Sequence, residues 1–449
     1  MDAPSRRRVL AVAAVAAGAS GCLDGAGSAS TASPSTTSGD ETPTASPTAT
    51  DPHTPTATEP PTASDTATDP STGSPATESP GVAWRDAFDE PVTARPFVGE
   101  DRLFAGSEGG TLRAYGSDGD LAWKRDFPSR VRDLTVADGT LLALVGTDEL
   151  SSAHTVHALD AASGRERWTF SPTDWWLDVL AASGGTAYVA TADDALSESG
   201  ETLYALDLVG GDTEWSAGIG DPREAVLTDD AVVVSSSGRT YGFDRTDGRQ
   251  RWSRPAETVY STLAAVDGTV VYADSSEADD VYSELLGLDA ASGEERWRLD
   301  SWAVTTTVAG DGDLFAGGAR TARIDPADGS AAWTVDKPGL LTDAGLTGDR
   351  LYAGGDELHA LTREGGERAW TWTPDPPQGG VSAAGVADET LYLDSYHDAD
   401  VRNQYKFAVE TADGSDRWTF ENGTELTDLS VGADLAVGGG EDGTLYALR

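Results

Sequence analysis

Two groups of side chains in this sequence have the residue types of a metal site. His154 and His157 stand three residues apart in the segment HTVH, and His397, Asp398 and Asp400 cluster in the segment SYHDAD. Imidazoles and carboxylates commonly bind divalent cations. Residues three apart on a β-strand point to opposite faces, however, so the two histidines do not converge. The second group is the kind of solvated loop expected in an acidic chain. The sequence therefore predicts no metal site.

Four tryptophans lie outside the repeated positions described below: Trp175, Trp176, Trp302 and Trp372. The first three come just before or within the innermost strand expected in their repeat units. Exposed tryptophans often dominate binding energy, and a flat ring can stack on a quinone or a sugar. Trp175, Trp176 and Trp302 are therefore candidate ligand-binding or partner-binding residues. The alternative is that they pack inside the fold like the other tryptophans.

Sequence motifs of catalysis are missing. There is no G-x-S-x-G, H-E-x-x-H or P-loop motif, so we predict no catalytic residues. The single cysteine, Cys22, excludes an internal disulfide and a thiolate metal cluster. One N-glycosylation acceptor is present, Asn422 in the sequence NGT, and glycosylation there is expected if the protein is exported.

The charge of the chain is extreme. It has 76 acidic residues against 31 Lys and Arg, a formal net charge of −45. Only Lys124, Lys337 and Lys406 are lysines. Such a surface suits concentrated salt, where the Debye length falls to about 3 Å and self-repulsion is screened. We infer a halophile, an archaeon. Nucleic acid is excluded as an expected partner because its phosphates would meet a negative surface.

The first eighty residues have the features of export and of a linker. In residues 1–22, three arginines (Arg6 to Arg8) precede a short Ala/Val run that ends at Cys22. The segment resembles a twin-arginine signal with a lipobox-like end, which makes Cys22 a lipidation candidate and implies a lipid anchor in the membrane. Residues 23–80 are rich in Thr, Ser and Pro and contain no aromatic residue, so we expect a disordered linker.

From residue 81 onward the chain is built of repeats. LDAASGRERW at 159–168 recurs as LDAASGEERW at 288–297, and related segments end each unit. The tryptophans that close these units are Trp84, Trp123, Trp168, Trp215, Trp252, Trp297, Trp333, Trp370 and Trp418, spaced 36 to 48 residues apart. This period, with several short strands in each unit, is typical of propeller blades. We expect these tryptophans on the outermost strands, packed against the next blade.

Residues 303–337 illustrate one unit, in which four strand-like runs are separated by Gly and Asp. The decapeptide is the expected hairpin between the third and fourth strands. Its Asp can cap backbone N–H groups, and its Gly supplies a positive φ. No sustained helical periodicity follows residue 81, so the fold class is all-β and the decapeptide is a structural device.

The repeat resembles the pyrroloquinoline-quinone-like (PQQ-like) β-propeller family, on segments such as GTAYVATADDALSESGETLYALDLVGGDTEW at 185–215. The resemblance covers residues 81–449. It implies a propeller and leaves function open, because the family includes quinoprotein dehydrogenases and lipoprotein scaffolds of membrane-protein assembly. The dehydrogenases use vicinal cysteines and a Glu/Asn/Asp calcium site, which cannot be mapped onto this chain. We therefore expect no cofactor, with PQQ and calcium as the less favoured alternative.

The ends of the repeat region predict a closed ring. Residues 82–88 form an orphan outer strand, and the last sixteen residues supply the inner strands of a unit without its Trp strand. Pairing them would remove the free edges of the sheet. Counting tryptophans gives nine blades, whereas eight is the family norm, and the length fits either number.

Together these features predict an exported, lipid-anchored, monomeric propeller on the extracellular side of the cell membrane. Its expected role is non-catalytic binding or scaffolding, with a cell-envelope protein or a small ligand as partner. The alternatives are a quinone-dependent oxidoreductase and a receptor for polysaccharides or solutes.

Overall fold

The structure is a computed structural model of the 449-residue chain. It describes residues 81–99, 101–147, 154–172, 176–192, 201–236, 238–256, 263–275, 283–300, 304–336, 339–396, 405–432 and 434–449. The expected signal at 1–22, with Cys22, and the expected linker at 23–80 lie outside these residues. No helix in the described part of the chain is both long and apolar enough to cross a membrane.

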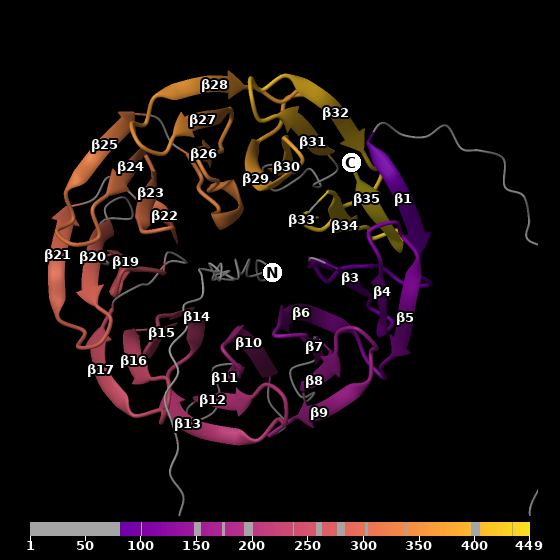
Figure 1. Ribbon diagram of the computed structural model, residues 1–449, viewed down its shortest axis with the longest axis horizontal. Helices are drawn as coiled ribbons and strands as arrows, with labels where there is room; N and C mark the ends of the chain where they lie inside the picture. The colour runs from indigo at the N-terminus through magenta and orange to yellow at the C-terminus, as the bar shows by residue number, and fades with distance from the viewer. Residues whose placement is uncertain are drawn as a thin grey trace, which may run out of the picture. The chain divides into compact units, whose positions relative to one another are not determined.

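Nine antiparallel sheets follow one another around a central axis (Figure 1), and each is a blade of a propeller. In the following ranges the strands of each blade are given from the innermost to the outermost. Blade 1 is β2 (Phe97–Val98), β3 (Leu103–Gly106), β4 (Thr111–Tyr115) and β5 (Leu121–Asp126), and blade 2 is β6 (Val131–Ala137), β7 (Thr140–Val145), β8 (Thr155–Asp160) and β9 (Glu166–Phe170). Blade 3 is β10 (Trp176–Ser183), β11 (Thr186–Ala192), β12 (Glu201–Asp207) and β13 (Thr213–Ile219), and blade 4 is β14 (Pro222–Leu227), β15 (Ala231–Ser236), β16 (Arg239–Asp244) and β17 (Gln250–Pro255).

The second half of the ring continues in the same way. Blade 5 is β18 (Ala264–Val266), β19 (Thr269–Ser275), β20 (Ser283–Asp289) and β21 (Glu295–Asp300), and blade 6 is β22 (Val304–Gly310), β23 (Asp313–Gly318), β24 (Arg320–Ile324) and β25 (Ala331–Asp336). Blade 7 is β26 (Arg350–Ala353), β27 (Leu358–Thr362) and β28 (Arg368–Trp372), and blade 8 is β29 (Gly380–Ala387), β30 (Thr390–Tyr396), β31 (Tyr405–Glu410) and β32 (Asp416–Glu421). Blade 9 is β33 (Ser430–Val431), β34 (Ala436–Gly439), β35 (Thr444–Leu448) and β1 (Val82–Ala87).

Blade 9 confirms the predicted closure and decides the blade number in favour of nine. Its outermost strand, β1, pairs antiparallel with β35, so residues from opposite ends of the propeller share one sheet. Figure 1 shows these two strands side by side. Sharing a sheet leaves no free edge at the junction between the first and last repeats.

The apolar core lies between neighbouring blades. The second strand of blade 2, β7, is buried along its whole length, whereas the outermost strands such as β1 alternate between half-buried and exposed positions. This pattern follows from stacking the sheets face to face: middle strands are covered on both faces, and the outermost strands keep a solvent-facing side. The predicted all-β fold class is confirmed by the nine sheets.

The nine repeat tryptophans fasten each blade to the next, as predicted. Each stands on an outermost strand and donates its indole N–H to a backbone carbonyl of the following blade, with N–O distances of 2.9 to 3.1 Å. In order along the chain the accepting residues are Ser117, Ala161, Leu208, Arg245, Ala290, Pro326, Arg363, Thr411 and Arg449. We call each of these contacts a tryptophan latch.

There is a second reason why this position of the decapeptide is a glycine, and the sequence did not reveal it. Gly164 has φ +68°, and a Cβ there would lie 2.6 Å from the ring of Trp123. The ring of one blade thus lies flat against the hairpin backbone of the next. At the closure Gly81 takes this place beneath Trp418, and the N–H of Arg449 donates to the carbonyl of Gly81 at 2.7 Å. The two ends together reproduce the hairpin.

Blade 7 departs from the all-strand prediction. In place of a regular innermost strand it has two isolated bridges and a 3₁₀ turn, η1 (Asp343–Gly345). The hydroxyl of Thr342 accepts the N–H of Gly345 at 3.2 Å, which caps the turn. It also donates to the carbonyl of Ala383 in blade 8 at 2.8 Å. A local side-chain cap thus replaces strand pairing here.

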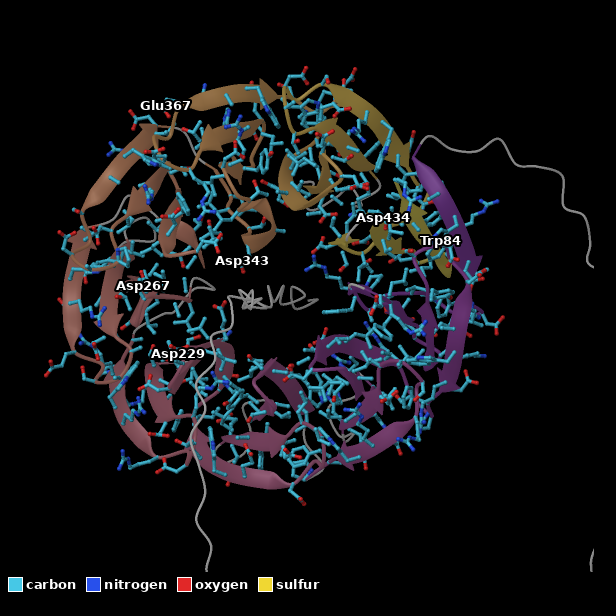
Figure 2. All side chains as sticks on the ribbon, viewed as in Figure 1. Trp84, Asp229, Asp267, Asp343, Glu367 and Asp434 are labelled. Atoms are coloured by element: carbon cyan, nitrogen blue, oxygen red, sulfur yellow. The ribbon has the colours of Figure 1, made fainter. Side chains whose placement is uncertain are left out.

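The ring has two unlike faces. One, which we call the turn face, carries the short hairpins that join the first strand to the second and the third to the fourth. The other, the loop face, carries the connections from the second strand to the third and from each blade to the next. Figure 2 shows Trp84 on the outer strand, with Asp267 and Asp434 nearer the axis.

Candidate functional site

Trp176 is the one candidate binding tryptophan within the described residues. It begins β10, the innermost strand of blade 3, at the loop-face end, which confirms its predicted position. Trp175 and Trp302 fall outside the described residues. Trp372, the fourth tryptophan outside the repeat, is buried between blades, where its indole N–H donates to the Asp416 carboxylate at 2.6 Å.

The ring of Trp176 lies in a stack with two cationic or potentially cationic side chains. The imidazole of His154 is stacked on it, with ring centroids 5.4 Å apart and planes 12° from parallel. The guanidinium carbon of Arg132 lies 5.6 Å from the ring centroid. The indole N–H is buried and has no hydrogen-bond partner among the described residues. A buried Trp N–H usually has an acceptor, so this donor is noteworthy.

His154 is fixed by two backbone groups and is part of the stack rather than a metal ligand. Its Nδ1 accepts the N–H of Leu177 at 3.3 Å, so Nε2 carries the proton and donates to the carbonyl of Thr147 at 3.1 Å. Burial lowers the pKa of this imidazole, and the charge of Arg132 lowers it further. The side chain is therefore neutral near neutral pH and supports the ring of Trp176.

His157 points elsewhere, as its spacing from His154 predicts. Its Nδ1 contacts the Glu166 carboxylate at 3.0 Å, and its ring lies against Phe127 with centroids 4.6 Å apart. Within the part of the chain that the structure describes, no three His, Cys, Asp or Glu side chains converge as metal ligands. The other candidate cluster, His397 with Asp398 and Asp400, lies outside it.

Asn422 lies in the link from blade 8 to blade 9. Its side-chain NH₂ donates to the hydroxyl of Thr424 at 3.1 Å, and its carbonyl oxygen accepts the Tyr446 hydroxyl at 3.4 Å. The residue is half-buried. Glycosylation of Asn422 would break these contacts, and it stays a prediction.

Comparisons with known proteins agree with the repeat. The model of the family described as outer membrane protein assembly factor BamB, PQQ_2, matches residues 66–298 and 317–449. The chain belongs to this family. It is 23% identical over 231 residues to the outer membrane protein assembly factor BamB of Burkholderia pseudomallei, covering 48% of this chain and 57% of that protein.

Two further similarities are a partial match to a kinase and a likeness to a solved structure. The chain is 28% identical over 182 residues to the serine/threonine-protein kinase AfsK of Streptomyces coelicolor, covering 38% of this chain and only 20% of the kinase. The crystal structure of BamB from Moraxella catarrhalis has a TM-score of 0.49 at 16% identity, covering 82% of this chain and 99% of that one. The match spans 20% of the length of the kinase and 57% of the length of the Burkholderia BamB, which are the two curated relatives.

A buried ion pair was missed in the sequence of this BamB-like propeller. Lys406, fully buried in β31, donates to Oδ1 of Asp394 in β30 at 2.6 Å. The backbone N–H of Leu429, in the link to blade 9, donates to the same oxygen at 3.0 Å. Burial raises the pKa of Asp394, against the opposing effect of the Lys406 charge. The scarcity of lysine in the chain was the signal, because Lys406 is one of only three lysines and stands in an otherwise largely apolar strand.

A carboxylate near the inner edge of the ring was also missed. Glu224, on the innermost strand β14, accepts the N–H of Leu263 from the next blade at 3.2 Å. Burial raises the pKa of Glu224 to about 7; the hydrogen bond from Leu263 lowers it, and the charge of Asp343 raises it. No repeat signal marks this position, because it depends on how neighbouring blades meet.

Proposed function

We propose that this protein is a non-catalytic binding module of the cell envelope whose loop face engages a partner protein around Trp176. The observation that carries the proposal is the Arg132–Trp176–His154 stack, with its buried indole N–H that has no acceptor among the described residues. Aromatic rings supported on a rigid strand and flanked by a cation are typical of interface hot spots.

The distribution of repeat residues favours the same face. On the turn face the repeated residues are already engaged. The Asp side chains cap their own hairpins, and the Trp side chains contact the hairpin of the next blade, where they lie against the Gly backbone. The connections from the second to the third strand differ in length from blade to blade, and connections positioned by a rigid scaffold often carry function. The family description names an assembly factor, and a protein partner in the envelope is the corresponding proposal for this chain.

The test is partner capture with matched variants. The full chain, tagged and crosslinked in the cells that produce it, should capture an envelope protein that Trp176→Ala and Arg132→Ala lose. The control is Val209→Ser, which alters an exposed residue of a turn-face hairpin. Equal capture by Trp176→Ala, or loss with Val209→Ser alone, would contradict the proposed face.

The competing functions predict other results. A quinone-dependent oxidoreductase requires saturable, one-to-one binding of PQQ with Ca²⁺, followed by tryptophan fluorescence and calorimetry. A polysaccharide receptor requires carbohydrate binding that Trp176→Ala abolishes. We expect neither, and either result would replace the scaffold proposal.

Export and anchoring form a separate part of the proposal. We propose that Cys22 is lipidated and holds the propeller at the extracellular side of the cell membrane. Cys22→Ala should then release the protein into the medium or leave it unlipidated. Membrane association of Cys22→Ala equal to that of the unchanged chain would contradict lipid anchoring at this residue.

A further inference from the structure

In four blades an arginine sits at the β-bulge just before the latch tryptophan: Arg167, Arg251, Arg296 and Arg417. Blade 2 shows its role. The guanidinium of Arg167 donates to the carboxylate of Asp160 at 2.9 Å and to the hydroxyl of Thr140. In blade 5, Arg296 makes the same two contacts with Asp289 and Thr269. The repeat therefore contains a built-in guanidinium position above the hairpin.

Blade 6 keeps this hairpin but lacks its arginine. Trp333 pairs with Arg323 and Ala331 with Ile324, which leaves Ala332 at the bulge. The turn is unchanged, because the N–H of Asp325 donates to Ser330 at 2.8 Å, as that of Asp160 does to Arg165. One oxygen of Asp325 accepts the N–H of Ala327 at 2.8 Å. Its other oxygen has no guanidinium partner in the described part of the chain.

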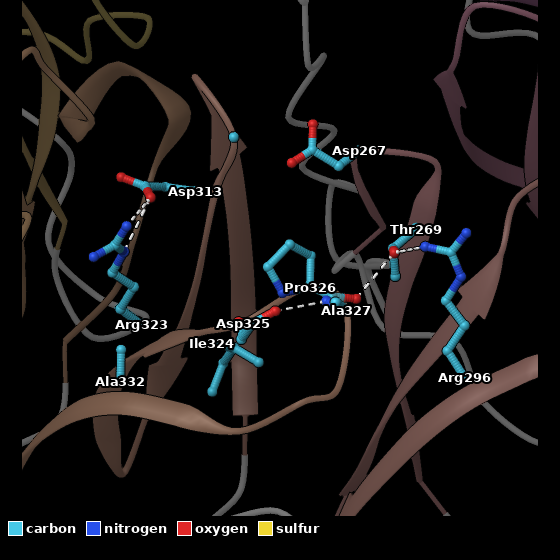
Figure 3. A pocket seen from close by; sticks show the side chains of 11 residues that line it. Asp267, Thr269, Arg296, Asp313, Arg323, Ile324, Asp325, Pro326, Ala327 and Ala332 are labelled. Atoms are coloured by element: carbon cyan, nitrogen blue, oxygen red, sulfur yellow. Dashed lines mark hydrogen bonds and ion pairs between the residues drawn. The ribbon is translucent and has the colours of Figure 1, made fainter.

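A pocket of about 410 Å³ lies on the turn face at this place, between blades 5 and 6. Figure 3 shows Asp313 and Arg323 on one side of it, Asp267, Thr269 and Arg296 on the other, and Asp325 between them. Ala332 and Asp325 are both part of its wall. The missing arginine side chain thus coincides with a hollow.

The charges of this pocket favour a cation. Arg296 is bound to Asp289. Asp313 is already paired on both oxygens, with Arg323 at 3.0 Å and with Arg363 at 2.9 Å. Asp267 and Asp325 are exposed carboxylates that no cationic side chain of the described residues contacts. Asp267 and Asp325 therefore have spare acceptor capacity, whereas Asp313 and the basic groups are already paired.

The other blades that lack the bulge arginine compensate in the described structure. In blade 3 the position holds Glu214, whose side chain accepts the Thr186 hydroxyl at 3.2 Å. Blades 1 and 7 have alanine there, but Gly116 and Thr362 replace the turn aspartate. In blade 9, Arg449 at the turn pairs with Asp434. Blade 6 alone keeps the aspartate, loses the arginine and leaves the space open.

We propose that the blade 6 pocket binds a guanidinium group on a flexible alkyl chain, in the position that the repeat's own arginine occupies in blades 2 and 5. The group would contact the free oxygen of Asp325 and pass over Ala332, with Asp267 as the second carboxylate of the pocket wall. Its source is either a free guanidino compound or the arginine side chain of a partner segment. Planar guanidinium groups suit paired carboxylate acceptors better than an ammonium does.

Calorimetry on the full chain tests this, at the lowest salt concentration at which the chain stays folded. Agmatine and acetyl-Gly-Arg-Gly-amide are the probes, and cadaverine is the ammonium control. We expect saturable binding of agmatine, and binding about tenfold weaker or absent for cadaverine. Binding of the tripeptide as well would identify a side chain as the source, whereas binding of agmatine alone would identify a small ligand. Absence of agmatine binding overturns the proposal.

Two substitutions make the test specific. Ala332→Arg supplies the repeat's residue, so it should fold normally and lose agmatine binding. Adding Arg167→Ala to that variant opens the corresponding position in blade 2, and agmatine should bind again beside Asp160. Undiminished binding by a folded Ala332→Arg variant would show that the ligand lies elsewhere and would refute the assignment.

Discussion

The two faces of this propeller are used in different ways. On the turn face, the same contacts recur from hairpin to hairpin. In five blades an aspartate caps the turn, as Asp160 does, a glycine backbone packs against a ring, and the tryptophan of the preceding blade donates to a carbonyl. On the loop face, the noteworthy contacts occur once each, as in the Trp176 stack and the Lys406–Asp394 pair.

In a repeat protein, function is best sought where the repeat is broken. A side chain that recurs in the same contact has an architectural role in each blade. Departures from the repeat are informative instead, and they include one on the turn face itself, where Ala332 replaces an arginine. We therefore expect the uniform contacts to carry stability and the unique ones to contribute less to it when they serve binding.

The largest effect is expected at the buried ion pair near the loop face. Lys406→Met leaves the Asp394 carboxylate without its counter-charge in a fully buried site, which should lower the free energy of unfolding by about 3–5 kcal/mol. Chemical denaturation measures this loss. The double variant Lys406→Met/Asp394→Leu should recover most of it, because neither charge remains buried. A small loss in the single variant would show that this unique pair is not structural.

A turn-face glycine should give the next largest effect. Gly164→Ala places a methyl group 2.6 Å from the Trp123 ring and also strains a backbone at φ +68°, so we expect a loss of about 2–4 kcal/mol. Gly139→Ala is the matched control: its φ is +70°, but nothing lies within 4 Å of the added Cβ. The control should lose only about 1–2 kcal/mol from backbone strain. Equal losses would mean that ring packing contributes nothing to the latch.

Trp176 should matter less for stability than a latch tryptophan. Its ring is half-buried, and its stack with His154 and Arg132 is worth about 0.5–1.5 kcal/mol. Trp176→Ala should therefore unfold close to the unchanged chain in thermal denaturation, whereas Trp252→Ala, which removes a buried latch ring, should lose about 3–5 kcal/mol. A large loss of stability in Trp176→Ala would show that Trp176 has a mainly structural role.

The smallest effect is expected for the dependence of stability on acidic pH at Asp160. Hydrogen bonds from the Ser163 side chain and from Arg167 lower the pKa of Asp160 from 3.8 to about 2. Because the folded pKa lies below the unfolded one, this contribution to stability is present above pH 3.8 and is lost as the pH falls toward 2. Asp160→Asn should therefore be less stable than the unchanged chain near neutral pH, and this difference should shrink as the pH falls toward 2 and vanish only below it. A difference in stability that does not shrink between pH 3.8 and pH 2 would exclude this linkage.

Part of the candidate site was predictable and part was not. The sequence placed Trp176 at the start of an innermost strand because strand order follows from the repeat. It could not place His154 against that ring, because the contact joins blade 2 to blade 3. Glu224 and the Lys406–Asp394 pair were missed for the same reason: each depends on a backbone group of the following blade.

The all-β class, the strand order within each blade and the outer position of the tryptophans were all predictable from the amino-acid sequence. These follow from short-range periodicity and turn chemistry, which every unit repeats. The tertiary structure decided that the ring closes with nine blades, that Gly81 and Arg449 together form the last hairpin, and that the absence of an arginine at Ala332 opens a pocket. Those outcomes depend on contacts between different sheets, where packing rather than local pattern selects the result.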